Sequence, residues 1–337
     1  MKSSALKSSL PHIIAVLLFT VVSFAYFYPV LEGRKLDAHD TKVWLGSSKE
    51  ISDYREEHGG EPLWTNSMFG GMPAYMISVK YPGNLFKHLD NFLKIYNTPV
   101  AALFLSMLGF YIMLLFFRVN PWLAMAGAIA YGFSSYLFVS LSAGHNTKAY
   151  AMAYMAPVLG SVVWSFRKNA LTGGILFALF LSLEIMANHF QITYYTGLIV
   201  LVFGIFELAD AFKNKTLPAF MKTLGILVVA AVIAFAVNFA PLYSTLEYSR
   251  ESTRGQSELT AAAGNDQKGL DKDYITQWSY GIAESLTFLV PNFRGGATAP
   301  FPSDSETVKA LRKNNLGQAQ GQLFRYWGNH PSTSGPV

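Results

Sequence analysis

The sequence predicts an all-α polytopic membrane protein, a helical bundle that carries extramembrane loop subdomains. Its residues are 51% hydrophobic and only 14% charged, and the mean hydropathy is +0.27. An ordinary soluble domain carries about 25% charged residues. The apolar runs are continuous and lack the alternation of a barrel strand, so each span is expected to be a helix.

The first apolar run, Leu10–Leu31, is long enough to cross a bilayer as one helix, because about 20 residues span the hydrocarbon layer. Lys2 and Lys7 precede it, as in a signal peptide. However, the run exceeds an h-region of about 7 to 15 residues, and it ends in aromatic residues without a small-residue cleavage motif. Residues 1–31 are therefore expected to contain a retained transmembrane helix.

A polar segment, residues 32–97, follows and is expected to form an extracytoplasmic loop subdomain. Further apolar runs then predict a bundle of about six helices across residues 98–243, which makes about seven spans in all. These runs are Thr98–Phe117, Pro121–Leu141, Ala149–Phe166, Ala170–Ala187, Ile192–Phe212 and Thr223–Tyr243. Residues 244–337 are polar and Gly-rich. We expect them to be extracytoplasmic, and the chain to be part of a longer protein.

The cations of the short loops predict the orientation. Placing Lys2 and Lys7 in the cytoplasm places the other short-loop cations there as well, as the positive-inside rule requires. Those cations are Arg118, Arg167, Lys168, Lys213, Lys215 and Lys222. The turns at residues 142–148 and 188–191 then lie on the extracytoplasmic face.

Several classes of function are not expected. The net charge of +5 comes from dispersed cations and not from one basic patch, so no nucleic-acid partner is predicted. The sequence has no cysteine, which excludes disulfides and Cys-ligated metals and leaves the redox compartment open. It also lacks a Walker loop, a GxSxG elbow, an HExxH motif and a dinucleotide fingerprint, so no ATP- or NAD-driven mechanism is expected.

A cluster of ionisable residues, Asp37, His39 and Asp40, directly follows the first helix. Its carboxylates can act as a general base or hold a divalent cation through oxygen ligands. The alternative is a solvated, charged helix flank, and the spacing of the two aspartates does not decide between the two.

Two turns between spans carry further polar groups. His145, Asn146 and Lys148 offer donors suited to a phosphate or a sugar hydroxyl, although a plain polar turn is also common. Glu184 and Asn188 are four residues apart and share a helix face. A carboxylate near the end of an apolar span is costly unless it meets a partner or water.

His189 and Gln191 add polar groups at the same end as Glu184. A structural hydrogen bond between helices is the alternative there. Arg250 and Arg254 follow the last span, where guanidinium groups suit a lipid-linked phosphate or, equally, ordinary anionic headgroups. Trp64 and other aromatic residues can stack on sugar rings, although aromatic belts at interfaces are the commoner reason for them. The others are Phe69, Tyr75, Trp278 and Tyr280.

Several of these stretches resemble the bacterial YfhO-like membrane proteins. The resemblance covers nearly the whole chain, and its WTNSMFGGMP and NHFQITYY stretches are fairly specific. It rests on His39-Asp40, on residues 62–73, on Gly144-His145-Asn146, on residues 188–195, and on residues 278–296 with Pro291-Asn292-Phe293.

The resemblance implies the GT-C fold of integral-membrane glycosyltransferases, in the bacterial inner (cytoplasmic) membrane, with an extracytoplasmic active face. It implies transfer of a sugar from a polyprenyl-phosphate-linked donor, held among membrane lipid, to a cell-envelope acceptor. The catalytic carboxylate of the first loop then falls on Asp40, with Asp37 as second choice and His39 between them. Lys148, Arg250 and Arg254 are the candidates to offset charge on the leaving phosphate. No cofactor is certain from these residues. The candidate cofactor is a divalent cation, because carboxylate oxygens suit such an ion, and its ligands are unknown.

Two other functions stay open at this point. A transporter or flippase for a lipid-linked saccharide predicts ionisable groups at mid-membrane depth and broken helices. A non-catalytic envelope-assembly scaffold predicts loops that bind a protein partner, with Asp40, His145 and Glu184 all replaceable without effect.

Overall fold

The computed structural model describes residues 2–96, 98–249, 251–252, 276, 279–290, 293–295 and 300–326. These residues are mainly helical, with one two-stranded sheet among them. The chain divides into two compact units, Met1–Thr245 and Leu246–Val337. The expectation of an all-α membrane protein is confirmed at this level.

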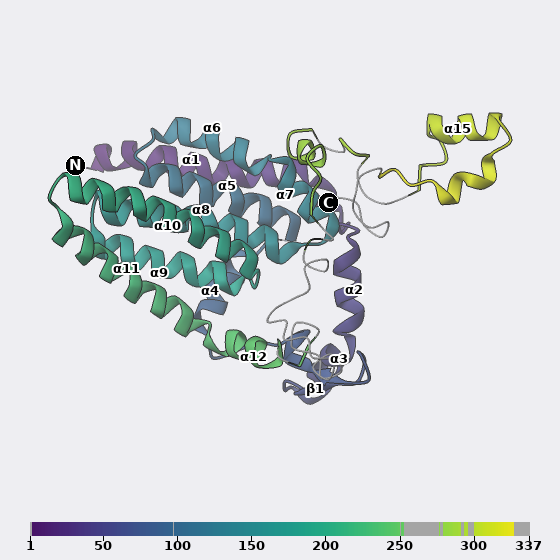
Figure 1. Cartoon of the computed structure of the whole chain (residues 1–337), viewed down its shortest axis with the longest axis horizontal. Coiled ribbons are helices and arrows are strands. Elements are labelled where there is room, and N and C mark those ends of the chain that lie inside the picture. Colours follow the sequence, from purple (N-terminus) through teal and green to yellow (C-terminus); the bar gives the residue numbers. More distant parts are fainter. Residues whose placement is uncertain are drawn as a thin grey trace, which may run out of the picture. The chain divides into compact units, whose positions relative to one another are not determined.

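The first unit is a bundle of apolar helices that lie side by side (Figure 1). They alternate in direction, so the chain passes back and forth between two ends of the bundle. The helices are α1 (Lys2–Tyr26), α5 (Thr98–Phe116), α6 (Pro121–Gly132), α7 (Ser135–Ala143), α8 (Asn146–Arg167), α9 (Ala170–Met186), α10 (Phe190–Lys213) and α11 (Leu217–Val237), followed by α12 (Phe239–Ser249).

Among the described residues, five helices are long and apolar enough to cross a membrane, and a bent pair makes up to six. The five are α1, α5, α8, α10 and α11. The bent pair is α6 and α7, whose axes differ by 43°, while α9 has only 17 residues. The chain is therefore a candidate multi-pass membrane protein, with fewer full-length spans than the seven expected.

The interruption between α6 and α7 lies inside a sequence run that was predicted to be one helix. Ser134 has extended backbone angles and ends the regular hydrogen bonding there. Just before it, Gly132 packs so closely on Met107 of α5 that a Cβ atom would overlap that side chain. The bend therefore occurs where α6 approaches α5 most tightly.

Two other predicted boundaries were wrong by several residues. The first helix ends at Tyr26, and a short 3₁₀ helix, η1 (Tyr28–Glu32), replaces its expected last turn. Pro29 lies in η1 and cannot donate a backbone hydrogen bond to continue the α-helix. The last span was predicted at residues 223–243, but α11 begins at Leu217 and ends at Val237. Asn238 separates it from α12.

Small residues bring the central helices together. α5 packs most extensively against α8, and a Cβ atom at Gly109 would overlap the carbonyl oxygen of Ala153. Close backbone approach through glycine is typical of helix pairs in membranes. By contrast, α10 and α11 expose large apolar side chains, including Phe206 and Val232, as expected for helices that face lipid.

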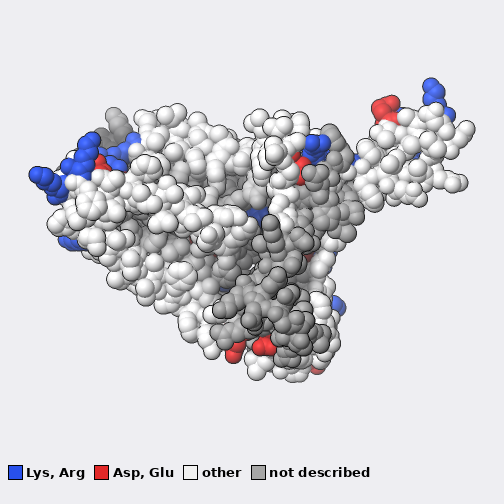
Figure 2. All heavy atoms as spheres, viewed as in Figure 1, with Lys and Arg blue, Asp and Glu red and all other residues white. Residues whose placement is uncertain are grey.

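Basic side chains gather at the end of the bundle that carries the N-terminus (Figure 2). The turns at this end include Arg118, Arg167 and Lys215, and Arg167 forms an ion pair with Glu207 of α10. At the opposite end, the two short turns that begin α8 and α10 contain His145 and His189 and no Lys or Arg. The two ends of the bundle therefore differ in charge.

The segment between α1 and α5 folds into small elements at this less basic end. They are α2 (His39–Ser47), α3 (Lys49–His58), β1 (Trp64–Thr65), β2 (Met72–Pro73), the 3₁₀ helix η2 (Ala74–Met76) and α4 (Leu85–Leu93). The two strands are antiparallel, with Trp64 opposite Pro73. The WTNSMFGGMP stretch is therefore a hairpin, and the indole of Trp64 fills the space beside Gly71.

The second unit contains η3 (Glu284–Phe288), α15 (Glu306–Lys313) and η4 (Gly317–Gln322). Glu284 is buried in it, accepts a hydrogen bond from the backbone N–H of Gly281 at 2.6 Å and contacts the hydroxyl of Tyr326. An isolated bridge joins Pro300 to Phe324.

Candidate functional site

A cavity of about 580 Å³ lies at the less basic end of the bundle. Its wall combines α2, the segment after η2, α4, the start of α8, the turn between α9 and α10, and the junction of α11 with α12. Aliphatic and aromatic side chains line it together with several side-chain amides, a combination that is common in ligand sites. The aromatic and amide side chains of the wall include Trp44, Tyr75, Tyr81, Asn84, Asn146 and Asn238.

A carboxylate and an imidazole meet beside this cavity. The Nε2 atom of His145 lies 3.0 Å from the Oδ2 atom of Asp40, and both side chains are partly exposed. Neither residue lines the cavity itself. Their neighbours do, because Trp44 follows Asp40 by one turn of α2 and Asn146 follows His145.

The local sequence explains how these two residues meet. Gly144 ends α7 in the left-handed region, with φ +93°, a conformation that glycine adopts without strain. A Cβ atom there would lie 2.9 Å from the backbone nitrogen of Thr41, so only glycine lets α2 approach this turn. Asn146 then donates from Nδ2 to the hydroxyl of Thr41 at 3.3 Å.

The charge state of His145 follows from its surroundings. Burial lowers its pKa from 6.5, Lys148 lowers it further, and Asp40 opposes both. The neutral imidazole is therefore the main form at pH 7, and it can donate a hydrogen bond from Nε2 to the Asp40 carboxylate. Burial, Lys148 and His145 also lower the pKa of His189.

Glu184 lies deeper in the bundle. Its side chain is fully buried in α9, and its Oε1 atom accepts a hydrogen bond from the hydroxyl of Thr196 in α10 at 2.6 Å. Its Oε2 atom has no hydrogen-bond partner among the described residues. This arrangement agrees with the structural alternative for Glu184, an interhelical hydrogen bond.

An ionic cluster that the sequence analysis missed lies in α4 and the turn after it. Asp90 has a fully buried side chain that lies 2.8 Å from Lys87 Nζ and 2.5 Å from Lys94 Nζ. The hydroxyl of Tyr154 donates to the same carboxylate at 3.3 Å. Burial lowers the pKa of Lys94, whereas Asp90 raises it. The spacing of residues 87, 90 and 94 is the helical pattern that could have revealed this cluster.

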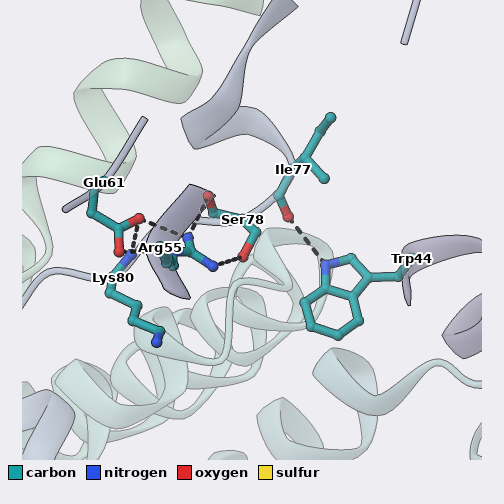
Figure 3. Close-up of polar contacts among 6 residues, drawn as sticks. All are labelled: Trp44, Arg55, Glu61, Ile77, Ser78 and Lys80. Atoms are coloured by element: carbon teal, nitrogen blue, oxygen red, sulfur yellow. Dashed lines mark hydrogen bonds and ion pairs between the residues drawn. The ribbon is translucent and has the colours of Figure 1, made fainter. Parts of the chain in front are cut away.

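A second set of polar contacts joins Arg55 and Trp44 to the chain segment around Ser78 (Figure 3). Arg55 of α3 donates to Glu61 at 2.8 Å and 2.7 Å, and also to the hydroxyl and the carbonyl oxygen of Ser78. Trp44 donates from its indole nitrogen to the carbonyl oxygen of Ile77 at 3.1 Å. Ile77 and Ser78 line the cavity, so these contacts fix that part of its wall.

The other predicted site residues are more scattered. Asp37 forms an ion pair with Lys42, and His39 is exposed at the start of α2. Asn188 lines the cavity, but Gln191 is exposed and donates to Tyr195 one turn later.

Lys148 donates to the hydroxyl of Tyr136 at 3.3 Å, and Trp64 belongs to the hairpin and not to the cavity wall. Arg250, Arg254 and Trp278 lie outside the described residues. Of the predicted residues, the structure therefore gathers Asp40, His145, Asn146, Asn188 and His189 around one end of the bundle.

The described residues near Asp40 offer few protein ligands for a metal ion. Among the described residues, no three His, Asp or Glu side chains come together as ligands. Near Asp40 the donors are one carboxylate and the imidazole of His145, while Asp37 is engaged by Lys42. One or two carboxylates can hold Mg²⁺ together with water and substrate phosphates, so a divalent cation stays a prediction.

Comparison of the chain with family models, curated proteins and solved structures gives no match. The class of protein is therefore defined by the fold and the site alone. It is an all-α candidate multi-pass membrane protein with a cavity of mixed polar and apolar lining at one end of its helical bundle.

Proposed function

We propose that this protein is a YfhO-like glycosyltransferase of the GT-C type, which transfers a sugar from a polyprenyl-phosphate-linked donor to a cell-envelope acceptor. The observation that carries the proposal is the contact of Asp40 with His145 beside a cavity with aromatic and amide walls. The expected orientation places this end of the bundle outside the cytoplasm, because the opposite end carries the basic turns.

Asp40 is the base in the proposed reaction. One oxygen of its carboxylate takes the proton of the acceptor hydroxyl while the hydroxyl oxygen forms the new bond to the anomeric carbon. The bond from the anomeric carbon to the carrier phosphate breaks, and its electron pair stays on the phosphate oxygen. The reaction inverts the sugar's configuration and needs only one carboxylate, because the carrier phosphate is a good leaving group.

His145 is a positioning residue in this scheme. Its neutral ring donates to Oδ2 of Asp40, which leaves Oδ1 to accept the proton and holds the carboxylate in one orientation. Pre-orientation of a base in this way avoids a reorganisation cost in the transition state. Asn146 holds the turn of His145 against α2 through Thr41.

The test is a transfer assay on membranes that carry the full chain. The donors are polyprenyl-phosphate sugars, each radiolabelled in the sugar, and the product is labelled envelope acceptor. Transfer should be lost in Asp40→Asn and retained in Asp53→Asn, a matched change of a carboxylate that pairs with Lys49 on α3. Full activity of Asp40→Asn would move the base elsewhere.

One observation favours the second candidate, a transporter or flippase of a lipid-linked saccharide. The α6 and α7 pair is bent by 43° at a break in the middle of an apolar segment, and broken helices are common in transporters. In the same membranes, labelled lipid that crosses the bilayer without any transfer would support this candidate. The scaffold alternative has no comparable observation in its favour.

A further inference from the structure

The cavity beside Asp40 carries a positive charge that the proposed proton transfer does not use. Among the described residues that line it, the charged side chains are Lys87 and Lys94, and none is Asp or Glu. A ligand in this cavity therefore lies beside two lysine side chains, and no carboxylate of the described residues belongs to the cavity wall.

The two lysines share one buried counter-ion. Asp90 contacts both ammonium groups, and one carboxylate balances only one of them. Lys94 is the more buried of the two, with 18% of its side chain exposed, and its Nζ atom lies 4.2 Å from the ring centre of Tyr150. Burial of a charge without a full counter-charge is costly, so an anionic ligand would complete the balance.

The helix that carries this cluster is two-sided. Leu85 and Phe92 are highly exposed on one face of α4, whereas Asp90 is buried on the other. An amphipathic helix of this kind lies in the interface of a membrane, with its apolar side chains toward the lipid. With α4 in that position, its lysines would lie at the depth of phosphate headgroups.

We propose that Lys87 and Lys94 form an anion subsite that takes the phosphate or diphosphate of a lipid-linked ligand. This inference rests on the proposed function, since that ligand is the transfer donor. The lipid chain would stay in the bilayer beside α4, while its phosphate reaches the two ammonium groups and the side-chain amide of Asn84, which also lines the cavity.

The test measures binding by the purified full chain in phosphatidylcholine nanodiscs. Three probes are compared: a polyprenyl phosphate, the same polyprenol without phosphate, and inorganic pyrophosphate. The polyprenyl phosphate should bind at least roughly tenfold more tightly than the polyprenol, because a charge-assisted contact contributes about that factor or more. Pyrophosphate should bind more weakly than the lipid, since it gains nothing from the bilayer.

Lysine variants locate the subsite. Lys87→Gln and Lys94→Gln should each raise the Kd of polyprenyl phosphate by roughly tenfold or more. Lys49→Gln removes an exposed cation outside the cavity and should leave the Kd unchanged. Lys87 is partly exposed, so its variant keeps the test valid if Lys94→Gln does not fold.

The outcomes separate this inference from the proposed function. An unchanged Kd in Lys87→Gln, or equal binding of the polyprenol, would overturn the subsite even if Asp40-dependent transfer is observed. Lysine-dependent binding of polyprenyl phosphate without any sugar transfer would support the subsite and count against the transferase. If pyrophosphate binds with the same Kd as polyprenyl phosphate and this binding needs the lysines, the cavity contains an anion subsite. Its ligand would then be a free anion, which would overturn the assignment to a lipid.

Discussion

His145 Nε2 and Asp40 Oδ2 lie 3.0 Å apart, and the pair that follows them in sequence, Thr41 and Asn146, hydrogen-bonds alongside. The imidazole has one ring nitrogen on the carboxylate and one ring nitrogen available for its own partner. In the proposed reaction, Asp40 and His145 therefore act as one unit, and their variants should not be independent.

A double-mutant cycle tests this coupling. His145→Gln should lower the transfer rate by roughly 10²-fold, because the base loses its orientation, and Asp40→Asn should lower it further. The double variant should be no slower than Asp40→Asn, since His145 acts only through the carboxylate. Initial rates with one labelled donor measure all four proteins. Losses that multiply in the double variant would contradict the coupling.

The pH dependence of the transfer rate should reflect the protonation of His145. Its folded pKa is lowered below 6.5 by burial and by Lys148, so the acid limb of the rate should lie below pH 6.5. Lys148→Met removes one of these causes and should move that limb to higher pH. Lys42→Met, which instead breaks the pair with Asp37, is the control and should leave the limb in place.

The protonation of His145 should also make the stability of the fold depend on pH. The unfolded chain binds the His145 proton more tightly than the folded one, so its protonation favours unfolding. The contribution of neutral His145 should be complete above pH 6.5 and should be lost as the pH falls through the folded pKa. Thermal unfolding in detergent at several pH values, for the native chain and His145→Gln, measures this difference.

The buried bond between Thr196 and Glu184 should stabilise the bundle. Thr196→Val removes the donor at 2.6 Å and leaves a buried carboxyl oxygen unpaired, which should cost about 1–3 kcal/mol. Thr193→Val is a matched control, because the Thr193 hydroxyl is buried without a partner among the described residues. Denaturant unfolding in detergent should show a loss for Thr196→Val only. Equal stability of the two variants would contradict the assignment.

The contact of α5 with α8 should be intolerant of one methyl group. Gly109→Ala places a Cβ atom on the carbonyl oxygen of Ala153, and such overpacking costs about 1–3 kcal/mol. Gly204→Ala on α10 meets nothing within 4 Å and should be neutral or slightly stabilising, because alanine favours the helix. The midpoint of thermal unfolding distinguishes the two.

Arg55 should hold the outer wall of the cavity. Its side chain is only 11% exposed, and its partner Glu61 is 28% exposed. Arg55→Gln removes the charged partner of Glu61 and leaves its carboxylate with the backbone N–H of Lys80, which should cost about 1–3 kcal/mol. The segment around Ser78 should then become more sensitive to protease. An unchanged digestion pattern would show that Trp44 alone holds this segment through Ile77.

The sequence predicted the positions of the bundle helices well because continuous apolar runs have few alternatives in a membrane protein. It did not predict the break near Ser134, since the apolar run continues through it and the tight packing of Gly132 on Met107 is visible only in the structure. The ends at Tyr26 and Val237 were missed for a similar reason: the apolar composition extends past the helix.

The site was predictable residue by residue but not as an arrangement. Asp40 and His145 were each recognised from their local sequence, yet no spacing rule indicates that they touch, because α5, α6 and α7 lie between them. Lys87 and Lys94 were missed although their helical spacing to Asp90 was visible, since their importance depends on which face of α4 meets the cavity. The roles proposed for these residues are predictions, and the experiments above test them.

The separation of Thr41 and Asn146 by 105 positions also determines when the site can exist during synthesis. At about 5–20 residues per second, the ribosome needs roughly 5–20 s between these two residues. Throughout that interval Asp40 has been made while His145 has not. A nascent chain arrested before α8 would therefore contain the base without the residue that orients it, and transfer would begin only after α8 has joined the bundle.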